Sequence, residues 1–272
     1  MNIIKAQDYR LEAERLLSKD SSLDCIFPSL VRSRIKSAAE LYSKAGNIYG
    51  GIRNWTQAKE YWYKSFELDY SLHIGINLGE SYEKLNQPLE AINIYLEILD
   101  QENKISKPVY KILYKLGLNY MQVENWDKAL EYFYTCIDST DLSDLSTYKI
   151  LSSILVQKIH IDLKDFEKAS LIPFKTLSCE QNLNLDDDLI SSQNLNTHIL
   201  IGLLCLYTIK SSKIEESNIS KLNSSVLDDF IRSPEYQIYL ELIKCNLNEE
   251  LIQKIKKLES SQTILYLINY QT

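Results

Sequence analysis

The sequence contains few of the residues that interrupt helices, with seven glycines and five prolines among 272 residues. β-Hairpins and sandwiches use these residues heavily in their turns, so the shortage favours long helices. The chain also lacks an apolar run of about 18 residues, the length that a membrane-spanning helix needs. Its longest candidate, residues 199–207, is short and contains Gly202, and the charged first ten residues have no signal-peptide core. We therefore expect a helical protein that stays in the cytoplasm.

The sequence also has no excess of basic residues, and its net charge is −7. Nucleic-acid binding needs a basic surface, so we expect no nucleic-acid partner. The five cysteines are widely spaced and include no CxxC pair, which is typical of reduced thiols in the cytosol. The three histidines have no neighbours at metal-ligand spacing, and no phosphate-loop, nucleophile-elbow or zinc-protease motif occurs. We expect no metal, no cofactor, no catalytic residue and no enzymatic activity.

The sequence does contain a repeated pattern. Three segments carry apolar, small and aromatic residues at equivalent offsets, and a fourth carries a weaker copy. The first has Tyr42, Ala45, Gly46, Tyr49, Trp55, Ala58 and Trp62; the second has Leu78, Gly79, Tyr82, Pro88, Ala91 and Tyr95; the third has Leu113, Leu116, Gly117, Tyr120, Trp126, Ala129 and Phe133; the fourth has Val156, His160, Phe166 and Ala169. From alanine to alanine the spacings are 33, 38 and 40 residues.

This pattern resembles the tetratricopeptide repeat, in which a helix, a tight turn and a second helix recur about every 34 residues. Small residues such as Gly46 and Ala58 let two antiparallel helices approach closely. Aromatic residues such as Tyr49 and Trp62 are expected to fill the space between one pair and the next, because a single pair cannot bury its apolar face. Short polar turns are expected at residues 50–54, 86–87, 124–125 and 164–165.

We therefore predict an all-α fold. Residues 1–180 are expected to form a tetratricopeptide-like solenoid of antiparallel helix pairs, a twisted helical sheet. Residues 181–272, which are helical without a clean repeat, are expected to form a C-terminal helical bundle that packs on the sheet and caps it in one continuous structural unit. An amphipathic helix over residues 3–19 precedes the repeats, with Ala6, Tyr9, Ala13, Leu16 and Leu17 on one side.

The first repeat also resembles one particular family. Residues 37–49 read SAAELYSKAGNIY and residues 54–58 read NWTQA, which is similar to the start of a soluble NSF attachment protein (SNAP) of the alpha or gamma type. Residues 11–15, LEAER, and residues 126–133, WDKALEYF, are similar to other helices of that family. Only about the first 60 residues are specific, since the rest fits many helical-repeat proteins.

The resemblance implies a non-enzymatic adaptor for vesicle trafficking. SNAPs bind the four-helix SNARE complex, formed by syntaxin-like proteins and their partners, and recruit the hexameric ATPase NSF that takes it apart. They are cytoplasmic and associate peripherally with membranes. The family usually ends in an acidic stretch with leucine, and this chain has no acid after Glu259. That departure puts the NSF step in doubt.

A row of lysines, Lys104, Lys107, Lys111 and Lys115, is spaced for one helix face, with Pro108 in the first turn. By itself the row predicts either a solvated face or a contact for an acidic partner. The resemblance implies SNARE binding by these four lysines, together with Lys149, for which Lys158 is the rival position. The prediction requires that the protein's own acids do not neutralise the row.

A second candidate lies in the apolar segment at residues 25–31. The resemblance implies that Ile26, Phe27 and Leu30 form a membrane-contacting loop, with basic residues just beyond it. The alternative is that these side chains fold onto the first repeat as a buried cluster.

Two other functions remain open. Some tetratricopeptide domains act as co-chaperone-type adaptors that clamp the C-terminal carboxylate of a peptide with basic and amide side chains on three successive repeats. By offset, those positions hold Ser43, Asn47, Asn77, Lys111 and Lys115, and only Ser43 departs in type. The second possibility is a structural scaffold that binds another helical-repeat subunit, for which substitutions in the lysine row would have no effect.

Overall fold

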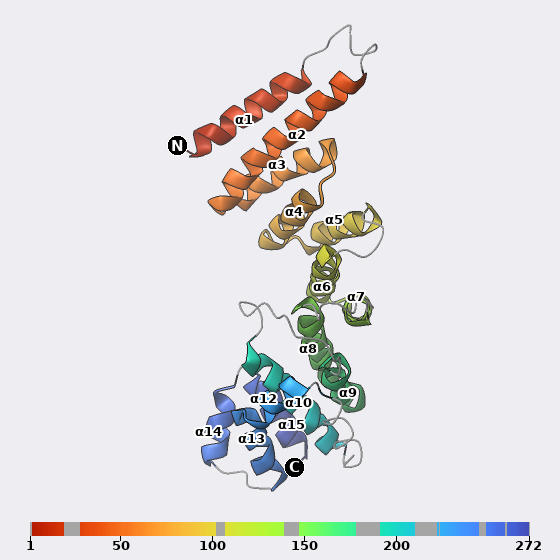
Figure 1. Cartoon of the computed structure of the whole chain (residues 1–272), viewed down its shortest axis with the longest axis vertical. Helices are drawn as coiled ribbons and strands as arrows, with labels where there is room; N and C mark the ends of the chain where they lie inside the picture. The colour runs from red at the N-terminus through yellow and green to blue at the C-terminus, as the bar shows by residue number, and fades with distance from the viewer. Residues whose placement is uncertain are drawn as a thin grey trace. The chain divides into compact units, whose positions relative to one another are not determined.

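The computed structural model describes residues 2–18, 28–101, 107–138, 147–177, 191–209, 222, 224–244, 249–258 and 260–271 (Figure 1). Over these residues the chain is all-α and contains no strand, and its fourteen helices pack in adjacent pairs. The predicted all-α, tetratricopeptide-like fold is confirmed. The chain forms two compact units, Met1–Ala129 and Leu130–Thr272. The domain boundary expected after residue 180 stays a prediction.

In the first unit, the residues that the structure describes form six helices and the beginning of a seventh. They are α1 (Asn2–Leu17), α2 (Pro28–Gly51), α3 (Trp55–Leu68), α4 (Leu72–Lys84), α5 (Pro88–Gln101), α6 (Lys107–Gln122) and the start of α7 (Trp126–Asp138). Consecutive helices from α1 to α6 contact one another. Helix α1 buries Ala6 and Ala13 completely, whereas Leu17, expected on the same side, is 40% exposed.

In the second unit, the described residues form the remainder of α7 and seven further helices. They are α8 (Thr147–Asp162), α9 (Phe166–Leu177), α10 (Ser192–Thr208), α12 (Ser224–Ile231), α13 (Pro234–Ile243), α14 (Glu249–Lys256) and α15 (Ser261–Gln271). Helix α10 is the centre of its core, because α9, α12, α13 and α15 all contact it. Leu200, Leu203 and Cys205 of α10 are buried completely or almost completely. The apolar run of residues 199–207 is therefore a core helix, and no described helix is long and apolar enough to cross a membrane.

All four repeats have the same turn between their two helices. One residue of each turn has a positive φ between 56° and 60°, and the next residue donates its backbone N–H to the carbonyl five residues earlier. The positive-φ residues are Arg53, Asn86, Glu124 and Lys164, and the backbone pairs are Asn54–Tyr49, Gln87–Tyr82, Asn125–Tyr120 and Asp165–His160. This is the hydrogen bonding that closes the C-terminus of a helix at a left-handed residue. The turns lie where the sequence predicts them, including the fourth.

Glycine is required where the first and second helices of a pair approach closely. A Cβ atom on Gly46 of α2 would lie 2.6 Å from the Trp62 ring of α3, and one on Gly79 of α4 would collide with Tyr95 of α5. Tyr49 and Tyr61 stack at 5.4 Å between the same two helices, α2 and α3. These contacts lie within the first pair, and the prediction that Tyr49 and Trp62 fill the space between successive pairs stays a prediction.

Candidate protein-binding face and a C-terminal pocket

Two lysines of the expected row, Lys111 and Lys115, lie one turn apart on α6, and both are partly exposed. Lys107 is the first residue of α6, Pro108 follows it, and their side chains lie outside the described residues. Lys104 lies outside the described residues altogether. The structure thus places the second half of the row on one helix.

These two lysines form ion pairs with acids of α4. The Nζ atom of Lys111 lies 2.7 Å from Oε1 of Glu80, and that of Lys115 lies 2.6 Å from Oε2 of Glu83. Lys115 is also 3.9 Å from Glu80. The protein's own carboxylates therefore offset the charge of this part of the row, contrary to the condition on which the predicted basic surface depends.

Glu83 joins three helices. Its carboxylate accepts hydrogen bonds from Lys115 and Asn119 of α6, at 2.6 Å and 2.8 Å, and from the Tyr95 hydroxyl of α5 at 3.2 Å. Burial raises the pKa of Tyr95 strongly, and the nearby carboxylates of Glu83 and Glu80 raise it further, so the hydroxyl remains a donor. This arrangement holds the second repeat to the third.

Five positions identified in the sequence form what we call the polar face. Its residues come from the first helices of three successive repeats: Ser43 and Asn47 from α2, Asn77 from α4, and Lys111 and Lys115 from α6. None of the five is buried, whereas the repeat-pattern residues between them, such as Gly46, Leu78 and Leu116, are. Helical periodicity therefore separates packing residues from a row of polar side chains that water can reach.

The polar face differs between its two halves. Counted from the repeat glycine, Asn47 of α2 is equivalent to Glu80 of α4, and His73 of α4 is equivalent to Lys111 of α6. Glu80 and Lys111 form an ion pair between α4 and α6. The equivalent residues one repeat earlier, Asn47 of α2 and His73 of α4, are polar without opposite charges. Asn47 accepts a hydrogen bond from the Trp62 indole at 2.9 Å, and Asn77 lies 3.4 Å from the His73 ring.

Lys149, expected on the basic face, lies on α8 of the second unit and is only 6% exposed. A buried ammonium group cannot grip an acidic partner without moving, so this position does not extend an exposed basic surface. The rival Lys158 is exposed on the same helix. Local spacing did not reveal this burial, because Lys149 lies on the side of α8 that also buries Ile150 and Ser153.

The expected membrane loop is described only in part. Ile26 and Phe27 lie outside the described residues, and Leu30 is the third residue of α2, not part of a loop. Its side chain is 55% exposed. Leu30 is therefore not part of a buried cluster, and its membrane contact stays a prediction.

Two histidines lie in the core of the second unit. His198 Nδ1 is 2.7 Å from Gln157 Oε1, and its Nε2 is 3.1 Å from the Ser153 hydroxyl. Burial lowers the pKa of His198 to about 3, and burial also lowers the pKa of His160, which contacts the Tyr134 hydroxyl at 2.7 Å. Among the described residues, no group of histidine, cysteine, aspartate or glutamate side chains could hold a metal ion.

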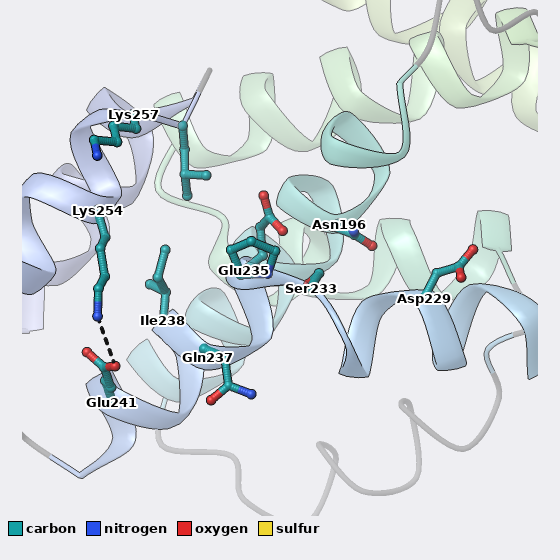
Figure 2. Close-up of a pocket in the computed structure, with 11 residues that line it drawn as sticks. Asn196, Asp229, Ser233, Glu235, Gln237, Ile238, Glu241, Lys254 and Lys257 are labelled. Carbon is teal, nitrogen blue, oxygen red and sulfur yellow. Dashed lines mark hydrogen bonds and ion pairs between the residues drawn. The ribbon is translucent and has the colours of Figure 1, made fainter.

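The second unit also contains a pocket of about 840 Å³ that the sequence does not indicate (Figure 2). It is bounded by side chains of α10, α12 and α13 and by the end of α14 with the residues after it. Glu235 and Asn196 line it with 2% and 8% of their surfaces exposed. In the sequence Glu235 has only the signature of a helix start, because acids are common in the first turn.

The sequence matches no protein-family model and no curated protein sequence. Among solved structures, BtubC (BKLC) from P. vanneervenii is similar over 81% of this chain and 87% of its own, with 15% identity and a TM-score of 0.51. A tetratricopeptide repeat protein from Parabacteroides merdae aligns over 98% of this chain and 99% of its own, at 15% identity and a TM-score of 0.44. YrrB, described as a TPR protein with an unusual peptide-binding site, aligns over 82% and 98%, at 12% identity and a TM-score of 0.45. At these identities the similarity concerns the fold alone, and the relationship to the SNAP family stays a prediction.

Proposed function

We propose that this chain is a non-enzymatic, tetratricopeptide-type adaptor whose polar face binds the C-terminal carboxylate of a peptide segment. Lys111 supplies the main cationic contact, and Asn47 and Asn77 supply amide groups for the peptide backbone. The observation that carries the proposal is that all five polar-face residues lie on successive first helices and are at least partly exposed, Asn47 the most, between side chains that are buried. Amide and ammonium groups in such a row match the acceptors of an extended peptide end.

Glu80 occupies the place of a ligand in this proposal. Its carboxylate lies 2.7 Å from Lys111, where a peptide carboxylate would make the same charge-assisted contact. Both side chains are about one-third exposed, and ion pairs near a surface contribute only about 0–1 kcal/mol. A peptide carboxylate with additional hydrogen bonds can therefore displace Glu80 at little cost. Lys115, held by Glu83 and 21% exposed, has mainly a positioning role.

The experiment is a fluorescence-anisotropy titration with an acidic pentapeptide that ends in a free carboxylate. We expect the same peptide with an amidated C-terminus to bind much more weakly, because the amide lacks the charge. Lys111→Ala should weaken binding of the free carboxylate about tenfold, the loss expected for a charge-assisted hydrogen bond. Lys84→Ala is the matched control, since Lys84 is exposed at the end of α4 and lies outside the polar face.

Equal binding of the two peptides, or an equal effect of the two lysine variants, would contradict the proposal. An assembled SNARE four-helix bundle serves as the second ligand in the same assay. The SNAP resemblance predicts that the bundle binds and that NSF is then recruited, and its basic surface includes Lys107, Lys111 and Lys115. If the bundle binds while the peptide does not, the SNARE adaptor replaces the peptide adaptor as the function.

A further inference from the structure

Among the residues that the structure describes, a carboxylate and an amide of the second unit's pocket have no partner. Glu235 and Asn196 line the pocket, both are more than nine-tenths buried, and neither side chain has a hydrogen bond or ion pair with the residues that the structure describes. A buried carboxylate is costly unless a cation or several donors satisfy it. Glu235 lines the pocket without a partner among the described residues, so a cation that enters the pocket can satisfy its carboxylate.

Neighbouring side chains do not fill this need. Ser233 donates to the Phe230 carbonyl at 2.7 Å and accepts from the Tyr236 N–H at 3.3 Å, which commits its hydroxyl to the cap of α13. Lys254 pairs with Glu241 at 3.5 Å, as Figure 2 shows, and with Glu250 at 3.2 Å. The N-terminal end of α13 favours a negative charge at Glu235, but it supplies no hydrogen bond to the carboxylate.

Part of the pocket wall is apolar and suited to an aliphatic chain, beside the polar side chains of Asp229 and Gln237. Pro234, Ile238 and Leu258 line it, and the last two are 2% and 6% exposed. A volume of about 840 Å³ lies within the range of about 300–1,000 Å³ that is typical of small-molecule sites. The pocket thus joins an apolar wall to a buried acceptor, a combination that fits an organic cation better than an inorganic one.

We propose that this pocket binds a guanidinium group on an aliphatic stem, as in an arginine side chain. Two N–H groups of the planar guanidinium donate to the Glu235 carboxylate, and a further N–H donates to the Asn196 side-chain oxygen. The stem lies along Ile238 and Leu258. The source is either an arginine of a partner protein or a free arginine-like amine. This site uses residues of the second unit only, so it does not depend on the polar face of the first.

The test is an NMR titration of the full chain with arginine and with citrulline, its neutral isostere. We expect arginine to shift the side-chain amide signal of Asn196 and citrulline to shift it at least about tenfold more weakly, because a charge-assisted hydrogen bond is lost. Glu235→Gln should reduce arginine binding to the level of citrulline. Asp228→Asn, which removes an exposed acid of α12 outside the pocket, should not.

Equal binding of arginine and citrulline to the unmodified protein would overturn the proposal without the use of any variant. So would arginine binding that Glu235→Gln leaves unchanged, or that moves signals only outside the pocket.

A capped Gly-Gly-Arg-Gly-Gly peptide, compared with free arginine, distinguishes the two sources. Tighter binding of the peptide indicates a partner's side chain, and tighter binding of free arginine indicates a small-molecule ligand. Lys257→Ala tests the remaining cation of the pocket, and its removal should strengthen arginine binding by removing a like charge.

Discussion

At the scale of single residues, the two carboxylates of α4 have different surroundings. Glu83 accepts from an ammonium, an amide and a phenol hydroxyl, whereas Glu80 forms ion pairs with Lys111 and Lys115 and is more exposed. Replacing Glu83 by Gln leaves Lys115 without its close carboxylate partner. We expect Glu83→Gln to lower the free energy of unfolding by about 1–3 kcal/mol, the cost of breaking a partly buried network with a charged member. Urea unfolding checks this, and a loss no larger than that of Glu80→Gln would contradict it.

His198 predicts how stability depends on pH. Its pKa is about 3 in the folded protein and about 6.5 in an unfolded chain, so between these values the unfolded state binds more protons. Stability is therefore complete above pH 6.5 and falls as the pH decreases, by up to about 1.4 kcal/mol per unit for this group. His160, with a pKa lowered by burial, contributes in the same direction.

The measurement is the urea midpoint at pH 7.5 and at pH 5.5. His198→Gln should reduce the difference between the two midpoints, because the neutral side chain no longer titrates. His73→Gln is the control, since His73 is exposed on α4. An unchanged difference in His198→Gln would show that the imidazole is not held neutral in the core.

At the scale of secondary-structure elements, the four helix-ending turns carry left-handed residues that are not glycine. Side chains with a Cβ are strained in this conformation, whereas glycine is not. We expect Arg53→Gly, Glu124→Gly and Lys164→Gly each to raise the free energy of unfolding by about 0.5 kcal/mol, the strain removed less the entropy that glycine adds to the unfolded chain. Asn86→Gly should have a smaller effect, because asparagine tolerates this region. Thermal unfolding of the four variants tests the ranking, and a loss in all of them would contradict it.

The same turns show what the sequence could predict. Their polar dipeptides lie at fixed offsets from the repeat alanines, so helix pairs, turns and the weak fourth repeat followed from local pattern. The ion pairs did not, because Lys115 and Glu83 are 32 residues apart and a lysine row with no acid inside it looks unpaired. Burial of Lys149 and of Glu235 also depends on tertiary packing. The periodicity of a single helix specifies which side chains share a face, but not which neighbour covers that face.

At the scale of the whole molecule, each compact unit carries one candidate binding site. The polar face belongs to Met1–Ala129 and the pocket with Glu235 belongs to Leu130–Thr272. A repeat fold suits such a division, because each repeat contacts mainly its neighbours and exposes its own row of side chains. The two proposed sites take chemically different ligands, a carboxylate and a guanidinium, so the two titrations can be measured separately.

The most direct test of the polar face compares the affinity of the free-carboxylate peptide for the unmodified protein and for Glu80→Gln. In our account Glu80 competes with the ligand for Lys111, so its neutralisation should tighten binding by up to about fivefold, which corresponds to the worth of a surface ion pair. The amidated peptide should show no such gain. Affinity that is unchanged or weaker in Glu80→Gln would mean that Lys111 does not hold the ligand, and the proposed function would then be wrong.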